Sequence, residues 1–478
     1  MRQVLGIAVV LLPMICWGQP DTLWTRLYDN SEWDFAYAVQ QTADGGFIIA
    51  GNRGSDYHVY LVKTDSLGTQ QWSRVLGPLS SYAYDVQIAG DGGYILGGVD
   101  EAHNRGLLIK TNAVGQTQWT RELDENWTVC INRVVECPGG GCVAVGLAGP
   151  STVEFYAYVA RLDAQGAILW QHECSECTNS TDPDVSSRFD AICPASNGGY
   201  ILAGVVDSML APADRDFLYA KVDSAGSFVW TRALELPGAY QWVSNLQPVS
   251  DGYLLMGFDE WYLEILRIDE DGNLVSRRAI PRSDTLDVHC SRMYLLPSGN
   301  LLTAGTCNFP FDDPTLPDMS LACISPADSL LWMKRYGGPA NEYGEDMKLT
   351  RDGGCIIVGR TASFGANVWD FYAVRTGPVE EPSAATEAPT PPSSFSLSNF
   401  PNPFNSSTEI SYEISRAGKL RLSVFDLLGR EVAVLEDGRM AAGSHRDRFD
   451  GKDLASGVYI YRLQTAEGAR AGKMVLLK

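Results

Sequence analysis

The chain has 478 residues, a formal net charge of −21 and 45% hydrophobic residues. This length exceeds that of one ordinary domain, and the hydrophobic content is sufficient for a sizeable core. A surface with this much negative charge repels phosphate backbones, so we expect no nucleic-acid partner. The 47 glycines lie in spaced turns, which is typical of many short strands with tight connections.

The first residues are typical of an export signal. Arg2 precedes an apolar run over Val4–Ile15, and the small residues Cys16 and Gly18 follow it. This pattern predicts a signal peptide over 1–18 that is cleaved after Gly18. In an alternative interpretation, Cys16 is the lipidated residue of a lipoprotein. No segment reaches the roughly 20 apolar residues of a membrane helix, so we expect no membrane span.

The following part of the chain repeats one pattern seven times. Each repeat has an apolar run, a turn such as Asp44-Gly45-Gly46, and a second run that ends in glycine. A variable loop, a third run ending in a basic residue, another turn and usually a tryptophan complete the repeat. The glycines that end the second run are Gly51, Gly98, Gly146, Gly204, Gly257, Gly305 and Gly359. Four short strands, here named a to d, in a unit of about 50 residues indicate a propeller blade.

The two ends of this array complement each other. Leu23–Leu27 resembles a strand d, and the seventh repeat ends after Arg375 without a strand d of its own. We therefore predict that the N-terminal segment completes the seventh blade, which removes the exposed edges of an open array. The sequence thus predicts an all-β protein with a seven-bladed β-propeller over 19–376.

The last part of the chain differs in composition. Residues 377–394 contain five prolines and no aromatic residue, which predicts an extended linker. Residues 395–478 return to alternating strand patterns, which predict a small β-sandwich.

Four motifs in this last segment carry a family resemblance. They are Phe400–Asn405, Val424–Val432, Leu454–Leu463 and Lys473–Lys478. With them the segment resembles the type A C-terminal sorting domain of the type IX secretion system, and it is similar to the Ig-like domain of flagellar hook-capping proteins. Phe400 stands where the family commonly has tyrosine. The residues that match the sorting motif are Pro401, Asn402, Pro403, Phe404, Gly429, Gly457 and Tyr459.

The resemblance implies an Ig-like fold over 395–478 and recognition by the secretion machinery. It also implies export to the extracellular space or the outer cell surface, after which such domains are cleaved or used for attachment. The repeats before it also resemble those found ahead of sorting domains in secreted bacterial proteins.

Export to an oxidising compartment makes disulfides plausible for the ten cysteines that remain without Cys16. Across a hairpin centred on Ser298-Gly299, regular pairing places Cys290 opposite Cys307. The remaining candidates are Cys137 with Cys142, which flank a turn, and Cys174 with Cys177, a CxxC motif. Three other cysteines are expected to be buried thiols: Cys193, Cys323 and Cys355.

The d–a and b–c loops emerge on one face of a propeller, here named the loop face, and they are long and variable in this chain. Variable loops on a rigid scaffold commonly carry binding. Aromatic side chains there can stack on sugars or peptides, or alternatively seal contacts between blades. The candidates are Trp33, Tyr82, Trp127, Tyr240, Trp242, Trp261, Phe311 and Trp369. The tryptophan that recurs in most repeats is expected to serve the scaffold instead.

Motifs for catalysis are missing from the sequence. The five histidines show no HExxH spacing, and no GxSxG motif occurs, so we expect no catalytic set, metal site or cofactor. The predicted function is a non-catalytic surface or extracellular module that binds glycan or protein. One alternative is a propeller glycoside hydrolase or lyase with paired carboxylates. Another is a structural envelope protein.

Overall fold

The computed structural model divides into two compact units, Met1–Glu381 and Pro382–Lys478, which are described separately here. It describes residues 19–379 and 396–476 apart from short gaps. The gaps are 29–32, 124–126, 151–154, 175–184, 197, 209–214, 237–240, 260, 282–287, 308–316, 366–368, 401–403, 405, 415–417, 427–429, 441–442, 453 and 466–467. The regular elements in the described ranges are all strands, which confirms the all-β prediction. A helix long and apolar enough to cross a membrane is not found in these ranges.

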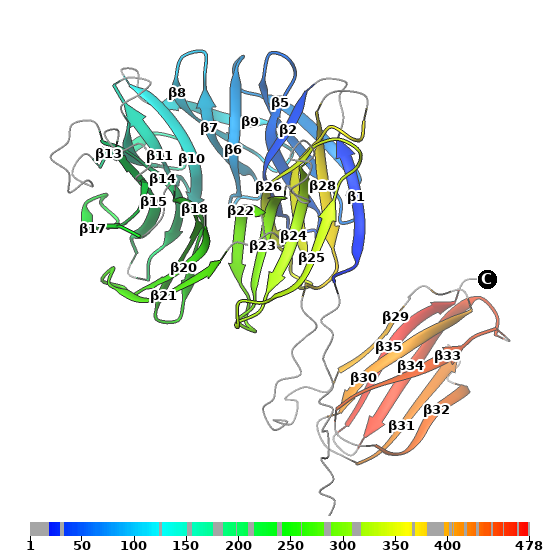
Figure 1. The fold of residues 1–478 in the computed structure, drawn as a ribbon. Helices are drawn as coiled ribbons and strands as arrows, with labels where there is room; N and C mark the ends of the chain where they lie inside the picture. Colours follow the sequence, from blue (N-terminus) through cyan, green and yellow to red (C-terminus); the bar gives the residue numbers. More distant parts are fainter. Residues whose placement is uncertain are drawn as a thin grey trace, which may run out of the picture. The chain divides into compact units, whose positions relative to one another are not determined.

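Seven four-stranded antiparallel sheets, numbered here as blades 1 to 7, make up the first unit (Figure 1). Blade 1 is β2 (Asp34–Gln41), β3 (Phe47–Arg53), β4 (His58–Thr64) and β5 (Gln70–Leu76). Blade 2 is β6 (Ser81–Ile88), β7 (Tyr94–Asp100), β8 (Arg105–Thr111) and β9 (Thr117–Leu123). Blade 3 is β10 (Thr128–Glu136), β11 (Cys142–Gly149), β12 (Tyr156–Leu162) and β13 (Ile168–Glu173). Blade 4 is β14 (Val185–Pro194), β15 (Tyr200–Ser208), β16 (Arg215–Val222) and β17 (Phe228–Leu234).

The remaining three blades follow the same order. Blade 5 is β18 (Trp242–Val249), β19 (Gly252–Phe258), β20 (Tyr262–Ile268) and β21 (Leu274–Pro281). Blade 6 is β22 (Val288–Leu295), β23 (Leu301–Cys307), β24 (Asp318–Ile324) and β25 (Leu330–Tyr336). Blade 7 combines β26 (Glu342–Leu349), β27 (Cys355–Thr361) and β28 (Asp370–Thr376) with β1 (Thr22–Tyr28).

The seven sheets form a closed ring. Strand a of each blade contacts strand a of the next, and β26 of blade 7 contacts β2 of blade 1. Seven apolar clusters fill the ring, one between each pair of neighbouring blades. The seven a strands therefore surround the ring axis, an arrangement consistent with the seven blades predicted from the repeats.

The N-terminal strand completes blade 7 as predicted. β1 pairs antiparallel with β28, with Leu27 opposite Tyr372 and Trp24 opposite Arg375 (Figure 1). The segment before β1 is also held, because the Lys334 ammonium donates a hydrogen bond to the carbonyl oxygen of Pro20 at 2.9 Å. Both ends of the first unit therefore lie in one sheet, and β1 covers the edge that β28 would otherwise expose.

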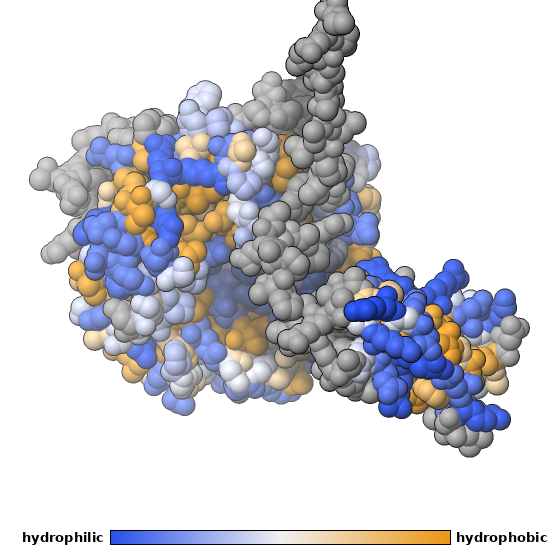
Figure 2. All heavy atoms as spheres, turned by 90° about the horizontal axis from the view of Figure 1, so that it is seen from below, coloured by the Kyte–Doolittle hydropathy of each residue, from blue (hydrophilic) through white to orange (hydrophobic). Residues whose placement is uncertain are grey.

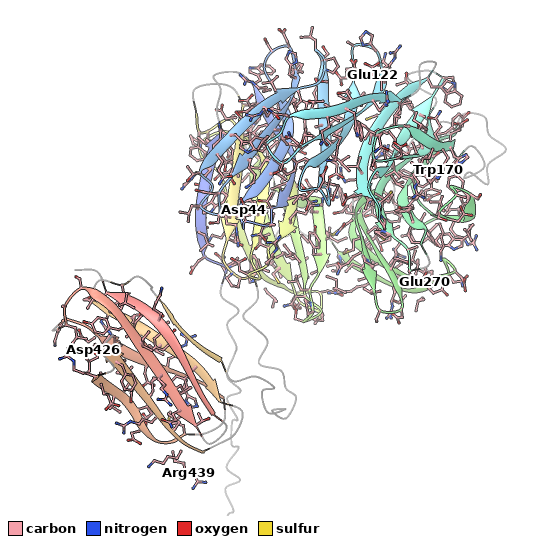
Figure 3. The ribbon with its side chains drawn as sticks, turned by 180° about the vertical axis from the view of Figure 1, so that it is seen from behind. Asp44, Glu122, Trp170, Glu270, Asp426 and Arg439 are labelled. Atoms are coloured by element: carbon pink, nitrogen blue, oxygen red, sulfur yellow. The ribbon has the colours of Figure 1, made fainter. Side chains whose placement is uncertain are left out.

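The recurring tryptophan of strand d joins a blade to the next at five of the seven junctions. A Cβ added at the c–d turn glycine of the following blade would lie within 3.0 Å of the indole ring. The pairs are Trp24 with Gly68, Trp72 with Gly115, Trp119 with Gly166, Trp170 with Gly226, and Trp230 with Gly272. Trp170, labelled in Figure 3, also donates from Nε1 to the Ser224 carbonyl at 3.4 Å. These residues serve the scaffold, as expected.

The basic residue of strand c pairs with the aspartate of the a–b turn in several blades. Lys63 lies 2.8 Å from Asp44, which Figure 3 labels, and Lys110 lies 2.7 Å from Asp91. Partial burial opposes ionisation of Asp44, but hydrogen bonds from Lys63, Thr42 and the Gly46 amide outweigh it and lower the pKa of Asp44 to about 2. The pairing fixes the a–b hairpin against strand c.

The outer strands d leave single hydrophobic side chains exposed. Leu169, Val229 and Val275 are each more than half exposed. Figure 2 shows hydrophobic residues interspersed with hydrophilic ones on the face that it presents. Scattered exposure of this kind is ordinary for a soluble surface and marks no binding site.

Every a–b strand pair of the ring contains a β-bulge opposite the repeat glycine. In blade 1, Ala36 pairs with Gly51 and Ala38 with Ala50, so Tyr37 is left over. A Cβ on Gly51 would lie 1.8 Å from the carbonyl oxygen of Phe35, so only glycine fits this position. The bulged residues of blades 1 to 7 are Tyr37, Tyr84, Asn132, Asp190, Ser244, Ser291 and Glu345.

The bulge in blade 6 corrects one disulfide prediction. Cys290 lies opposite Gly305 and Cys307 lies opposite Val288. The predicted register, which placed Cys290 opposite Cys307, is therefore wrong by two residues. One residue arises at the turn, next to which Leu295 pairs with Leu301, and the other arises from the bulge at Ser291.

The other cysteine predictions have separate outcomes. Cys137 and Cys142 are free thiols, and they face different sides of blade 3, since Cys142 packs toward blade 2 and Cys137 toward blade 4. The predicted bond between them is not formed. Cys174 is disulfide-bonded, whereas Cys177 lies outside the described residues, so their pairing stays a prediction. The three expected buried cysteines, Cys193, Cys323 and Cys355, are all buried.

The second unit has two sheets with one core between them. One sheet contains β29 (Ser396–Phe400), β30 (Ser407–Ile414) and β33 (Gly443–Asp450). The other contains β31 (Gly418–Asp426), β32 (Glu431–Met440), β34 (Gly457–Thr465) and β35 (Gly468–Leu476). Buried side chains of both sheets share a single cluster, so the unit is a β-sandwich.

Two residues of the sorting motif contribute to this sandwich. Phe404 is buried, forms a bridge with Leu476 and packs edge-on against Phe449 at 6.0 Å between ring centres. Tyr459 is buried too, and its hydroxyl donates to the Ala455 carbonyl at 2.8 Å. Gly457 is the first residue of β34, and a Cβ at this position would have no neighbouring atom within 4 Å. The other motif residues, Pro401, Asn402, Pro403 and Gly429, lie outside the described residues.

Candidate functional site

A cavity of about 560 Å³, here named the central cavity, lies at the ring axis near the start of the a strands. Six of the seven blades contribute to it. Its lining residues are Tyr37, Tyr84, Cys130, Asn132, Arg133, Leu147, Arg188, Asp190, Trp242, Val243 and Glu345. Five of the seven bulged residues are among them. The repeat glycine therefore has a second role, because the bulge that it permits turns one side chain per blade toward the axis.

A network of buried charges lies one residue further along the a strands. Arg292 pairs with Asp346 at 2.5 Å, and Asp346 also accepts from the Val39 amide of blade 1 at 3.0 Å. Asp85 accepts from the Val134 amide of blade 3 at 2.9 Å. Burial alone would raise the pKa of Asp346, but the nearby positive charges, including Arg292, outweigh it and lower that pKa. These contacts tie blades together around the axis.

Two carboxylates line the central cavity, and each is held by an arginine. Arg188 Nε lies 3.0 Å from both carboxylate oxygens of Asp190, and Asn132 Nδ2 donates to the same group at 3.0 Å. Glu345 pairs with Arg360 at 2.8 Å. Burial raises the pKa of Glu345, although the charge of Arg360 opposes this shift.

Four tyrosines, here named the aromatic row, lead into the central cavity. Tyr57 stacks on Tyr82 with 5.3 Å between ring centres, and Tyr82 stacks on Tyr84 at 6.0 Å. Tyr84 meets Tyr37 edge-on at 5.3 Å. Tyr57 has a φ of 47°, a strained conformation for a bulky residue. The Tyr57 ring is tilted by 26° from that of Tyr82.

The predicted aromatic residues near this region fall into two groups. Trp242 lines the central cavity, and Arg188 and Arg215 lie over its ring at 5.1 and 4.4 Å. Tyr82 belongs to the aromatic row. Trp33 and Trp369 contact Phe35 at 6.5 and 6.4 Å between ring centres, so both border the row across blades 7 and 1.

The remaining predicted aromatic residues lie elsewhere. Trp127 contacts Tyr156 at 6.1 Å and packs against the core between blades 2 and 3. Trp261 is 63% exposed and does not line the central cavity. Tyr240 and Phe311 lie outside the described residues.

Sequence reasoning missed most of the residues that line the central cavity. The search for binding residues addressed the loops, whereas Tyr37, Tyr84, Asp190 and Glu345 lie inside strands. One signal was present in the repeats. The residue that becomes bulged varies from blade to blade, whereas the glycine opposite it is constant across the seven repeats.

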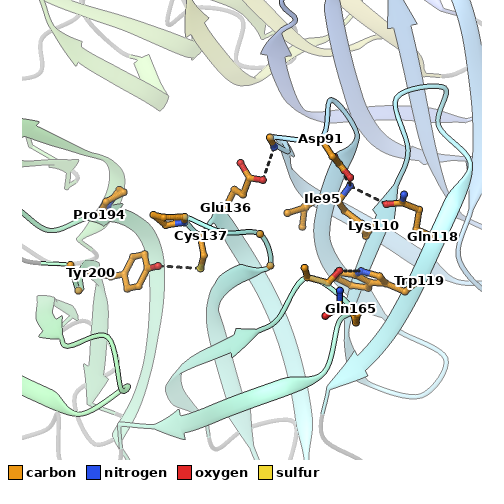
Figure 4. Close-up of a pocket in the computed structure, with 18 of the residues that line it drawn as sticks. Asp91, Ile95, Lys110, Gln118, Trp119, Glu136, Cys137, Gln165, Pro194 and Tyr200 are labelled. Carbon is orange, nitrogen blue, oxygen red and sulfur yellow. Dashed lines mark hydrogen bonds and ion pairs between the residues drawn. The ribbon is translucent and has the colours of Figure 1, made fainter.

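A larger cavity of about 1070 Å³ lies among the a–b and c–d turns of blades 2 to 4 (Figure 4). Its polar side chains bind one another. Lys110 pairs with Asp91, Glu136 accepts from the Gly90 amide at 2.6 Å, and the Cys137 sulfur lies 3.1 Å from the Tyr200 hydroxyl. Because the Lys–Asp pair recurs in blade 1, this pair belongs to the scaffold. Among the described residues, no group of three or more potential metal ligands occurs.

Comparison with known proteins identifies the C-terminal domain. Residues 398–477 match the family model of the secretion system C-terminal sorting domain. This match confirms the resemblance to the type IX sorting domain. The chain is therefore an exported protein, located at the cell surface or outside the cell, and its C-terminal domain engages the secretion machinery.

Two solved structures show distant similarity to the chain. One is to a fungal alcohol oxidase of the AA5 family in complex with copper, at 11% identity and a TM-score of 0.45, covering 96% of this chain and 100% of that chain. Another is to prolyl oligopeptidase B from Galerina marginata, at 9% identity and a TM-score of 0.40, covering 94% of this chain and 55% of that chain. Neither bears on function at these values. No curated protein matches the chain.

Proposed function

We propose that the exported ring binds a glycan at the central cavity and does not cleave it. The observation that carries this proposal is the aromatic row, which ends in a cavity lined by amide, carboxylate and guanidinium groups. Aromatic faces pack against the apolar faces of sugar rings, and the polar groups offer hydrogen bonds to hydroxyls. The cavity and three of the four tyrosines rest on strands of the rigid ring, and Tyr57 lies in the turn just before β4.

The shape of the cavity favours a glycan over a folded protein partner. A volume of about 560 Å³ lies in the range of small-ligand pockets, which is roughly 300–1,000 Å³. A protein partner would instead need a broad complementary surface of roughly 800 Å² on each side. An oligosaccharide can place one or two units in the cavity and further units along the aromatic row.

Two tryptophans of blade 5 provide a matched test. Trp242 is 41% exposed and lines the central cavity, whereas Trp261 is 63% exposed and does not. The full-length secreted protein is screened on a glycan array, and the affinity of the best ligand is measured by calorimetry. Trp242→Ala should weaken binding by about tenfold or more, roughly 1.4 kcal/mol, and Trp261→Ala should leave it unchanged. Equal effects of both substitutions, or no glycan ligand at all, would overturn the proposal.

Glu345 supports a second candidate function, a glycoside hydrolase or lyase. Burial raises the pKa of this carboxyl, as a general acid requires, and Asp190 is a second carboxylate of the same cavity. Array ligands are therefore incubated with the protein, and released products are analysed by mass spectrometry. Cleavage that disappears in Glu345→Gln would establish the enzyme, and intact ligands would support binding alone. A protein that neither binds nor cleaves any glycan would favour the structural envelope role.

A further inference from the structure

Arg133 differs from the other arginines around the ring axis. Arg188, Arg292 and Arg360 each form an ion pair, with Asp190, Asp346 and Glu345 respectively. Arg133 forms no ion pair with a carboxylate of the described residues, although it lines the central cavity together with Arg188.

The hydrogen bonds of Arg133 compensate its charge only in part. Nη1 donates to the carbonyl oxygens of Asn132 at 2.6 Å and Tyr84 at 3.3 Å, and Nε is buried without a partner. Burial lowers the pKa of Arg133, and the like charge of Arg292 lowers it further, although Asp85, Asp346 and Asp190 oppose these effects. A half-buried guanidinium that forms no ion pair favours an added anion.

The two carboxylates of the central cavity do not prevent an anion from binding. Asp190 is neutralised by Arg188 and hydrogen-bonded by Asn132, and Glu345 is neutralised by Arg360. Among the described charged residues that line the cavity, Arg133 is therefore the one that forms no ion pair.

We infer that the central cavity binds an acidic sugar, a uronic acid unit, with its carboxylate on Arg133 and its ring against Tyr84 or Tyr37. This inference rests on the proposed glycan binding and names the class of glycan. A planar guanidinium suits a carboxylate, because two parallel N–H groups can meet its two oxygens. Tyr84 and Tyr37 are the cavity end of the aromatic row, so an adjoining sugar can continue along the row.

The test compares a uronate oligosaccharide with the same oligosaccharide after reduction of its carboxyl groups to hydroxymethyl groups. Affinities for the full-length protein are measured by calorimetry at about 150 mM salt, where long-range repulsion by the negative chain is screened. The native protein should bind the uronate form about tenfold or more tightly than the reduced form. Arg133→Met should abolish this preference, so that the uronate form and the reduced form bind with about equal affinity.

Arg121→Met is the matched control. Arg121 also donates to a carbonyl oxygen, that of Gly166, but it lies on β9 outside the central cavity, so this variant should keep the preference. The urea unfolding midpoints of both variants verify folding.

The outcomes separate the inference from the proposed function. Equal or tighter binding of the reduced form would overturn the uronate inference and leave glycan binding standing. A preference for a sulfated, carboxyl-free oligosaccharide would identify the anion as sulfate and would also overturn it. Binding to acidic peptides alone, or to no glycan, would overturn the proposed function itself.

Discussion

Replacing the repeat glycine Gly98 by alanine tests whether the bulges shape both the ring and the central cavity. A Cβ at this position would lie 1.8 Å from the Tyr82 carbonyl oxygen, so β6 and β7 must separate or the bulge must disappear. Either change disturbs two ladder hydrogen bonds, at about 1 kcal/mol each, and the charged bond from the Val134 amide to Asp85, at about 2 kcal/mol. The expected loss is about 4 kcal/mol.

This free energy translates into a shift of the melting temperature. A ring of roughly 360 residues has an unfolding entropy of about 0.75 kcal/mol/K, so the melting temperature should fall by about 5 °C. The control is Gly92→Ala in the a–b turn of the same blade. Gly92 has a φ of 80°, and a Cβ there would meet only the Ala113 side chain at an ordinary 3.8 Å, so this variant should lose only about 1 kcal/mol, or roughly 1 °C.

Differential scanning calorimetry of the full-length protein measures both variants, and calorimetric titration measures ligand binding. Gly98→Ala should also weaken glycan binding, because the bulge turns Tyr84 toward the central cavity. If Gly98→Ala melts within about 1 °C of Gly92→Ala, the steric reasoning about the bulge is wrong.

Three further predictions concern closure, export and pH. Deleting residues 19–28 removes β1 and exposes β28, so the melting temperature should fall by more than it does in Gly98→Ala; an unchanged value would refute closure by β1. Removing residues 395–478 should leave a folded ring in the periplasm, and undiminished extracellular delivery in the native host would contradict the sorting role. Because the pKa of Asp44 is lowered from 3.8 to about 2, its carboxylate stabilises the folded state above pH 3.8 and loses this effect as the pH falls through 2. Asp44→Asn should therefore be less stable than the native protein at pH 6 and equally stable below pH 2, as measured by urea unfolding. A difference in the free energy of unfolding between the two proteins that does not change with pH would contradict this reasoning.

The repeats were predictable because their signals are local. A turn of Asp44-Gly45-Gly46 type, the glycine at the end of strand b and the tryptophan of strand d each recur at short distances, so strand number and ring closure follow from the sequence alone. The bulges were not predictable in this way. A regular hairpin was assumed for blade 6, and the clash that makes the bulge necessary involves a carbonyl on the neighbouring strand, which residue types do not reveal.

The central cavity could not be predicted from the sequence for a related reason. Its side chains come from strands of six blades that are far apart in the sequence, and only closure of the ring brings them together. Arg133 and Arg188, for example, look alike in the sequence, and their different partners emerge only from the distances between blades. The exposed tryptophans were predicted as binding residues from the sequence. Only the structure shows that Trp242 lines the central cavity and that Trp261 does not.

The pairing of β1 with β28 has a mechanical consequence. The chain continues from the end of β28 toward the C-terminal domain, so a pulling force applied through that domain meets the ring first at Val379, which donates to the Gly353 carbonyl, and then reaches β28 at Thr376. In the order β1-β28-β27-β26, the loaded strand has a neighbour on each side, and both ladders resist its extraction. Without β1 the same strand would be the edge of its sheet and would be held by β27 alone. When a protein is attached by its C-terminus and its ring binds a ligand, force on the ligand is transmitted through β28. The N-terminal strand β1 therefore reinforces the strand that carries this force.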